Sequence, residues 1–188
     1  MPVEEIFSKI STHMLNGVMV HEQFANYYDF LGLYGYRKCH EYHFYSESIS
    51  YRNICKFYIS TYNKLISEQI PKTTSVIPQP WYKYKRFDVD VNTKKNAIQL
   101  GLSKWVNWEK ETKAFYESMY RELINIGEVD AAIMVSSLVE DVSSELKCAE
   151  QYLLNKEMIG YNMSDIIAEQ EYEENMYSKK ICKLFSKK

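Results

Sequence analysis

The sequence has few of the residues that interrupt helices. Its 188 residues include only six glycines and four prolines. Because these two residues are the strongest local breaks in regular structure, their scarcity favours long, uninterrupted helices. Cysteine is scarce too: the four cysteines are widely spaced and form no Cys-x-x-Cys pair. This spacing argues against a zinc ribbon and against a small disulfide scaffold.

Other absences limit the class of protein. No apolar run approaches the roughly 20 residues that span a bilayer, and the N-terminal sequence MPVEEIFSKI lacks the features of a signal peptide. We therefore expect a cytoplasmic protein without a membrane partner. The formal net charge of −2 gives no basic footprint, so we expect no nucleic-acid partner. The absence of a Gly-rich phosphate loop and of a Gly-x-Ser-x-Gly turn leaves nucleotide binding and hydrolase chemistry unsupported.

Apolar side chains recur at intervals of three and four along most of the chain. The intervals predict helices over about residues 3–31, 37–68, 93–126, 128–157 and 164–185. Gly32 and Gly35 separate the first two, and Gly127 separates the third from the fourth. Short loops between long helices produce antiparallel hairpins. With 46% hydrophobic residues the chain can fill a core, and we expect one domain over residues 1–188.

A long connection joins the two predicted hairpins. Residues 69–92 contain three of the four prolines and are too many for a structureless loop, so we expect them to run the length of a bundle. Helices 37–68 and 93–126 would then be parallel. The aromatic residues Trp81, Tyr82 and Tyr84 make this crossover the expected place of a dimer contact. The sequence thus predicts an all-α four-helix bundle of two antiparallel hairpins with a short C-terminal fifth helix.

Four side chains of metal-binding type interrupt these apolar stripes. His40, His43 and Glu47 are spaced by three and four residues and so share one face of a helix, and Asp141 lies in the stripe of the 128–157 helix. An unpaired buried charge costs several kcal/mol, so such groups are normally neutralised, ion-paired or bound to a metal. Two other interpretations remain: hydrogen-bonded core histidines, and bundle-edge carboxylates paired with neighbouring lysine or arginine.

Over about residues 3–157 this pattern resembles the ferritin-like superfamily, including a ferritin-like group found in bacterial genomes and prophages. Members carry a Glu on the first helix, Glu-x-x-His on the second, a Glu on the third, and a Glu or Gln on the fourth. Aligning the first loop places Glu47 on the second-helix glutamate. Aligning the second loop places Glu109 on the third-helix glutamate and Asp141 near the fourth-helix ligand.

The same alignment leaves the family's site depleted. Met14 stands where the first-helix glutamate belongs, and Ser50 stands where the histidine belongs. A second register lies nearer the first loop, where His21 and Glu22 of the first helix meet the level of His40, His43 and Glu47. Glu145, one helical turn beyond Asp141, joins this register. At about 1.5 Å per residue these groups converge within roughly one turn.

Two or more histidines with several carboxylates suit Fe, Mn or Zn better than Ca or Mg. The resemblance implies iron, a homo-oligomer of two or more chains, and either iron handling or oxygen-dependent oxidoreductase chemistry. The alternative is a metal-free bundle that acts as a protein-interaction or structural module, of prophage origin. The candidate metal ligands are Glu22, His40, His43, Glu47, Glu109, Asp141 and Glu145.

Overall fold

The computed structural model describes residues 1–67, 85 and 89–186. Within these ranges the chain forms five helices and no strand, which confirms the all-α prediction. The helices are α1 (Val3–Leu31), α2 (Tyr34–Tyr62), α3 (Val91–Asn125), α4 (Val129–Met158) and α5 (Met163–Ser186). Most of the predicted crossover, with Trp81, Tyr82 and Tyr84, lies outside the described residues. No helix in the described part of the chain is long and apolar enough to cross a membrane.

Backbone chemistry explains the ends of most helices. Gly32 closes α1 in the left-handed region at φ 73°, and the Leu33 amide donates a 2.9 Å hydrogen bond to the Tyr28 carbonyl. Gly127, between α3 and α4, takes up the same left-handed conformation, with φ 80°. This geometry satisfies carbonyls at a helix end and suits glycine, which lacks a Cβ. Asp90 begins α3 by accepting hydrogen bonds from the Asn92 and Thr93 amides.

The bounds of α2 differ most from the prediction, which gave residues 37–68. The helix begins at Tyr34 although Leu33 offers no capping side chain, because the Gln170 Oε1 atom of α5 accepts hydrogen bonds from the Gly35 and Tyr36 amides. It ends at Tyr62, where Asn63 takes up the left-handed conformation at φ 52°. Asparagine tolerates this region better than most residues.

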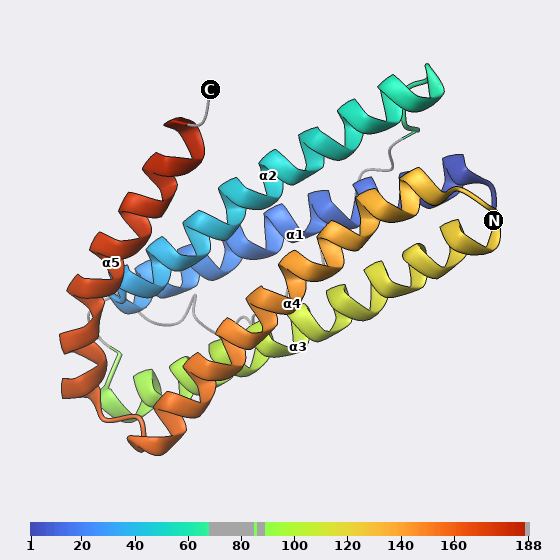
Figure 1. Cartoon of the computed structure of the whole chain (residues 1–188). Helices are drawn as coiled ribbons and strands as arrows, with labels where there is room; N and C mark the ends of the chain where they lie inside the picture. Colours follow the sequence, from blue (N-terminus) through green and yellow to red (C-terminus); the bar gives the residue numbers. More distant parts are fainter. Residues whose placement is uncertain (68–84, 86–88, 187–188) are drawn as a thin grey trace.

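The helices form a bundle of two hairpins, one of α1 and α2 and one of α3 and α4 (Figure 1). The helices within each hairpin are antiparallel, and α2 runs in the same direction as α3, as predicted from the long connection. The fifth helix packs against α2 and crosses the end of the bundle where α1 ends and α2 begins.

The apolar core falls into two clusters along the bundle. One cluster lies towards α5 and includes Phe24, Tyr28 and Trp105. The other lies towards the far end and includes Ile10 and Leu123. Each helix of the two hairpins carries polar side chains near the place where the two clusters meet, and this region holds the candidate site.

Candidate metal centre

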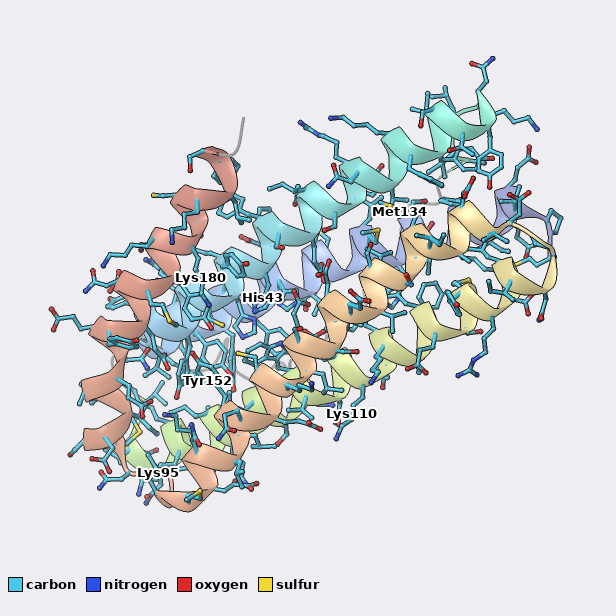
Figure 2. All side chains as sticks on the ribbon, viewed as in Figure 1. His43, Lys95, Lys110, Met134, Tyr152 and Lys180 are labelled. Carbon is cyan, nitrogen blue, oxygen red and sulfur yellow. The ribbon has the colours of Figure 1, made fainter. Side chains whose placement is uncertain are left out.

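Six ionisable side chains occupy the interval between the two apolar clusters, and we call them the polar layer. They come from all four helices of the two hairpins, and several are almost completely buried. In Figure 2 the side chain of His43 points from α2 into the space between the hairpins. The members of the polar layer are His21 of α1, His40, His43 and Glu47 of α2, Glu109 of α3 and Glu145 of α4.

His21 is the central residue of the layer and is completely buried. Its Nδ1 atom lies 3.0 Å from Nδ1 of His40, so one of the two rings donates a hydrogen bond to the other. Its Nε2 atom lies 3.6 Å from Oε1 of Glu47 and 3.5 Å from Oε1 of Glu109. These two separations are longer than ordinary hydrogen bonds. Nε2 therefore faces two carboxylates and has no hydrogen-bond partner among the described residues.

The carboxylates of Glu47 and Glu109 have few hydrogen-bond partners. Glu109 is 1% exposed, and its Oε1 atom accepts a 2.8 Å hydrogen bond from the indole of Trp105. Its Oε2 atom and Oε2 of Glu47 are buried without a hydrogen bond to any described residue. Within the described ranges, His21 is the single basic side chain at ion-pair distance from either group. The layer thus contains buried acids without a lysine or arginine to balance them.

Gly17 explains how Glu47 fits between the helices. A Cβ atom at position 17 would collide with Oε2 of Glu47 and lie 2.8 Å from its Oε1 and 2.9 Å from its Cδ. Contacts below 3.0 Å are essentially not made by real Cβ atoms. The missing side chain therefore leaves the space in which the Glu47 carboxylate lies beside α1. A glycine in the middle of a helix costs about 0.5–1 kcal/mol relative to alanine, so this space has an energetic cost.

Burial sets the protonation of the layer. Loss of water lowers the pKa of His21 and of His40 well below the usual value, with the neighbouring imidazoles adding to the effect. Burial also raises the pKa of Glu47 and of Glu109 well above the usual value, and nearby carboxylates raise it further. Without a bound cation these groups favour neutral imidazoles and neutral carboxylic acids.

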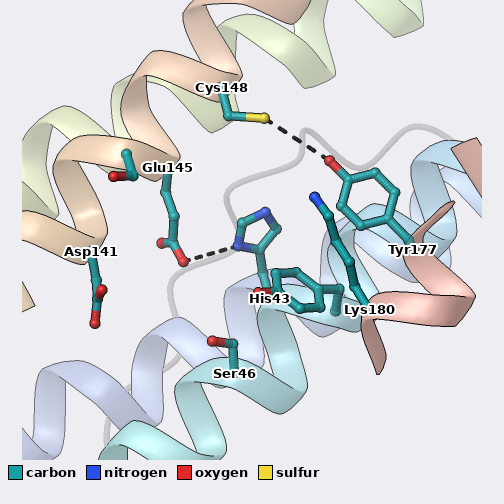
Figure 3. A pocket seen from close by; sticks show the side chains of 9 residues that line it. His43, Ser46, Asp141, Glu145, Cys148, Tyr177 and Lys180 are labelled. Carbon is teal, nitrogen blue, oxygen red and sulfur yellow. Dashed lines mark hydrogen bonds and ion pairs between the residues drawn. The ribbon is translucent and has the colours of Figure 1, made fainter. Parts of the chain in front are cut away.

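His43 and Glu145 connect the layer to the surface. The His43 Nδ1 atom lies 3.1 Å from Oε1 of Glu145. Two pockets meet at Glu145 and Asp141: one of about 250 Å³ reaches His43, and one of about 40 Å³ reaches Glu47. Figure 3 shows the larger pocket, with Asp141 and Lys180 on different sides of His43. Small polar molecules or ions thus have two routes towards the layer.

The structure brings together five of the seven predicted ligands: His40, His43, Glu47, Glu109 and Glu145. The other two lie outside the polar layer. Glu22 accepts a hydrogen bond from Asn26 of its own helix, and Asp141 is exposed, although it lines both pockets with Glu145. Both follow from the helical period, because His21 and Val142 face inward and their sequence neighbours are rotated by about 100°. His21, absent from the set of seven, occupies the centre, and its place in the apolar stripe was the available signal.

Residues of both sequence registers lie in this one region. Glu47 and Glu109 come from the register of the ferritin alignment, and His40 and His43 come from the register nearer the loop. Met14 belongs to the far apolar cluster, and Ser50 lines the smaller pocket beside Glu47. The polar layer is therefore built mainly from positions nearer the first loop.

The layer offers the imidazole nitrogens and carboxylate oxygens that Fe, Mn and Zn accept. In the described part of the chain, however, no group of three or more His, Cys, Asp or Glu side chains is arranged to hold a metal ion as the side chains stand. Comparisons with protein-family models, with curated proteins and with solved structures found no match to this chain.

Proposed function

We propose that the chain is a ferritin-like bundle that binds a transition-metal ion, iron first among the candidates, in its polar layer. His21, Glu47 and Glu109 would hold the ion, and Glu145 and His43 would complete the site from the pocket side. A bound iron would supply redox chemistry with dioxygen, for iron handling or for oxygen-dependent oxidation of a substrate. The assignment to the ferritin-like fold is part of the proposal.

One observation carries the proposal: the carboxylates of Glu47 and Glu109 and the imidazole of His21 converge with buried, unsatisfied atoms, and no lysine or arginine among the described residues balances them. Nε2 of His21, Oε2 of Glu47 and Oε2 of Glu109 are all buried without a hydrogen-bond partner in the described residues. Unpaired buried polar atoms are costly and are rare in native proteins. A divalent cation would use these lone pairs and would favour the ionised form of both acids.

The separations support this interpretation. Two donor atoms bound to one metal at about 2.1 Å lie roughly 3.0–3.4 Å apart for octahedral or tetrahedral angles. The 3.5 and 3.6 Å between His21 Nε2 and the two carboxylates are just beyond that range. Small rotations of the Glu47 and Glu109 side chains would therefore close the shell. His40 already bonds the other ring nitrogen of His21, as outer partners of metal ligands do. Trp105 donates to Oε1 of Glu109, the oxygen that faces His21, and leaves Oε2 free for an ion.

Metal loading with matched variants tests the proposal. The chelator-treated protein is loaded anaerobically with Fe(II), Mn(II) or Zn(II), passed through a desalting column, and analysed for metal per chain. We expect stoichiometric retention by the wild type. Glu47→Gln and Glu109→Gln keep the side-chain size but remove a charged ligand, and each should weaken binding by more than about 100-fold, beyond the effect of losing an outer partner. The control Glu22→Gln should bind as the wild type does.

Two outcomes contradict the proposal: no retained metal in the loaded wild type, or equal retention by wild type and Glu47→Gln. Either would favour the alternative of a metal-free bundle that works through protein contacts.

The mass of the protein in solution distinguishes iron storage from redox chemistry. A large cage of many chains, the form of homo-oligomer that storage requires, supports iron storage, whereas a monomer or dimer restricts the proposal to redox chemistry.

A further inference from the structure

The larger pocket shares His43 and Glu145 with the proposed metal site, but it also carries two charged side chains, Asp141 and Lys180, that the metal proposal does not use. It lies between α2, α4 and α5, and its volume is about 250 Å³. Since one water molecule takes up about 30 Å³ of liquid, the pocket has room for a ligand of roughly eight non-hydrogen atoms. His43 forms part of its wall, with one ring nitrogen bound to Glu145 and the ring facing the pocket (Figure 3).

Opposite charges line different sides of this pocket. Asp141 and Glu145 of α4 supply carboxylates, whereas Lys180 of α5 supplies an ammonium group beside the ring of Tyr177. The Lys180 Nζ atom lies 4.5 Å from the ring centre of Tyr177 and 5.6 Å from that of Tyr42. Among the described residues, no carboxylate lies within ion-pair distance of Lys180, and no lysine or arginine lies within that distance of Asp141. Asp141 and Lys180 thus carry separate charges without an ion-pair partner among the described residues, whereas Glu145 is hydrogen-bonded to His43.

We propose that this pocket binds a small zwitterion that carries an ammonium group at one end and a carboxylate at the other. The carboxylate binds Lys180 and the Tyr177 hydroxyl, and the ammonium group binds Asp141 and Glu145. Charge-assisted hydrogen bonds of this kind are the strong ones. A ligand with only one charge would leave the opposite side of the pocket unpaired. The middle of the ligand would contact His43 and so lie next to the polar layer.

The aromatic rings on α2 and α5 fit the same ligand. The rings of Tyr42 and Tyr177 lie beside the Lys180 ammonium group and form part of the pocket wall, where aromatic surface suits a short methylene chain. The α5 side of the pocket is also well anchored, since Gln170 of the same helix bonds to the start of α2. The spacing of the two charged sides should therefore select ligands by length.

A series of ω-amino carboxylates tests the proposal. Glycine, β-alanine, γ-aminobutyrate and ε-aminocaproate are titrated calorimetrically into chelator-treated protein, with butylamine and butyrate as singly charged controls. We expect saturable binding with an optimum chain length, and at least about tenfold weaker binding of both controls. Lys180→Met and Asp141→Asn should each weaken the best zwitterion by about tenfold or more. Lys179→Met, at an exposed neighbour outside the pocket, should have no effect.

Three results overturn this inference: no saturable binding across the series, equal binding of butylamine or butyrate and the best zwitterion, or full affinity in Lys180→Met. The substituted side chains are exposed, so circular dichroism and thermal unfolding should confirm unchanged folds. The inference does not depend on the metal. Glu47→Gln should lose metal and keep the zwitterion, whereas Lys180→Met should lose the zwitterion and keep metal.

Discussion

A single missing side chain, at Gly17, decides where the Glu47 carboxylate lies. Because any Cβ at position 17 would collide with this carboxylate, the glycine and the glutamate form a pair across α1 and α2. The collision involves the end of a flexible side chain, so an added methyl group would displace the carboxylate and leave the backbone in place. The pair can therefore be tested without unfolding the protein.

We expect Gly17→Ala to separate stability from metal binding. Alanine favours the helix by up to about 1 kcal/mol, so the chelator-treated variant should be as stable as the wild type or slightly more stable in urea unfolding. The displaced Glu47 carboxylate should weaken metal binding by at least about tenfold. In a Glu47→Gln background the same substitution should cause no further loss. Unchanged metal affinity in the single variant would contradict the role given to Gly17.

The sequence predicted single residues of the site less well than the helices that carry them. It identified His40, His43 and Glu47 because spacings of three and four place them on one face. It placed His21 and Glu22 together at the level of His40, His43 and Glu47 but took Glu22 as the ligand, although adjacent helical residues point about 100° apart and His21 is the buried one. Its spacing placed Asp141 in the inward stripe of the 128–157 helix, whereas Val142 is the buried residue.

At the scale of helices, α5 holds a buried acid against the start of α2. Glu173 is 7% exposed, and its Oε2 atom has no hydrogen-bond partner among the described residues. Gly35 of α2, Tyr152 and Lys156 of α4 and Glu169 of α5 surround it. Burial raises the pKa of Glu173 from 4.5 to about 7. A raised pKa contributes stability that is complete below pH 4.5 and is lost as the pH rises through about 7.

Glu173→Gln should therefore stabilise the protein in a pH-dependent way. Glutamine keeps the shape and cannot ionise, so the variant should match the wild type near pH 4.5 and exceed it at pH 8. A pKa change from 4.5 to about 7 corresponds to at most about 3 kcal/mol at the alkaline limit. Urea unfolding at the two pH values measures the difference. The exposed Glu171→Gln serves as a control, and equal gains at both pH values would contradict the account.

Helices were predicted well where their signals are local. The predicted 3–31 helix matches Val3–Leu31, and the three helices after the crossover agree within two residues at each end. Those elements have glycine turns or an aspartate cap in the sequence. The start of α2 depends on Gln170, which lies 135 residues from Gly35 along the chain. A capping group supplied by a distant helix leaves no local signal, which is why the prediction began three residues late.

Across the whole molecule, the polar layer divides a core that would otherwise be continuous. Two apolar clusters supply the burial that stabilises the bundle, and the layer between them costs stability because its acids and imidazoles are buried. A metal that binds only the folded protein would offset this cost, by about 2.7 kcal/mol when its free concentration is 100 times its dissociation constant. The layer is therefore the place where binding and stability are coupled.

Anomalous scattering from a crystal loaded with Fe(II), measured at the iron edge, tests the central claim most directly. We expect an anomalous peak in the polar layer, about 2.0–2.3 Å from Nε2 of His21 and from carboxylate oxygens of Glu47 and Glu109. Crystals of the Glu47→Gln variant, loaded with Fe(II) in the same way, should lack this peak. A loaded crystal without an anomalous peak in the layer, or with iron at surface carboxylates alone, would contradict the proposal.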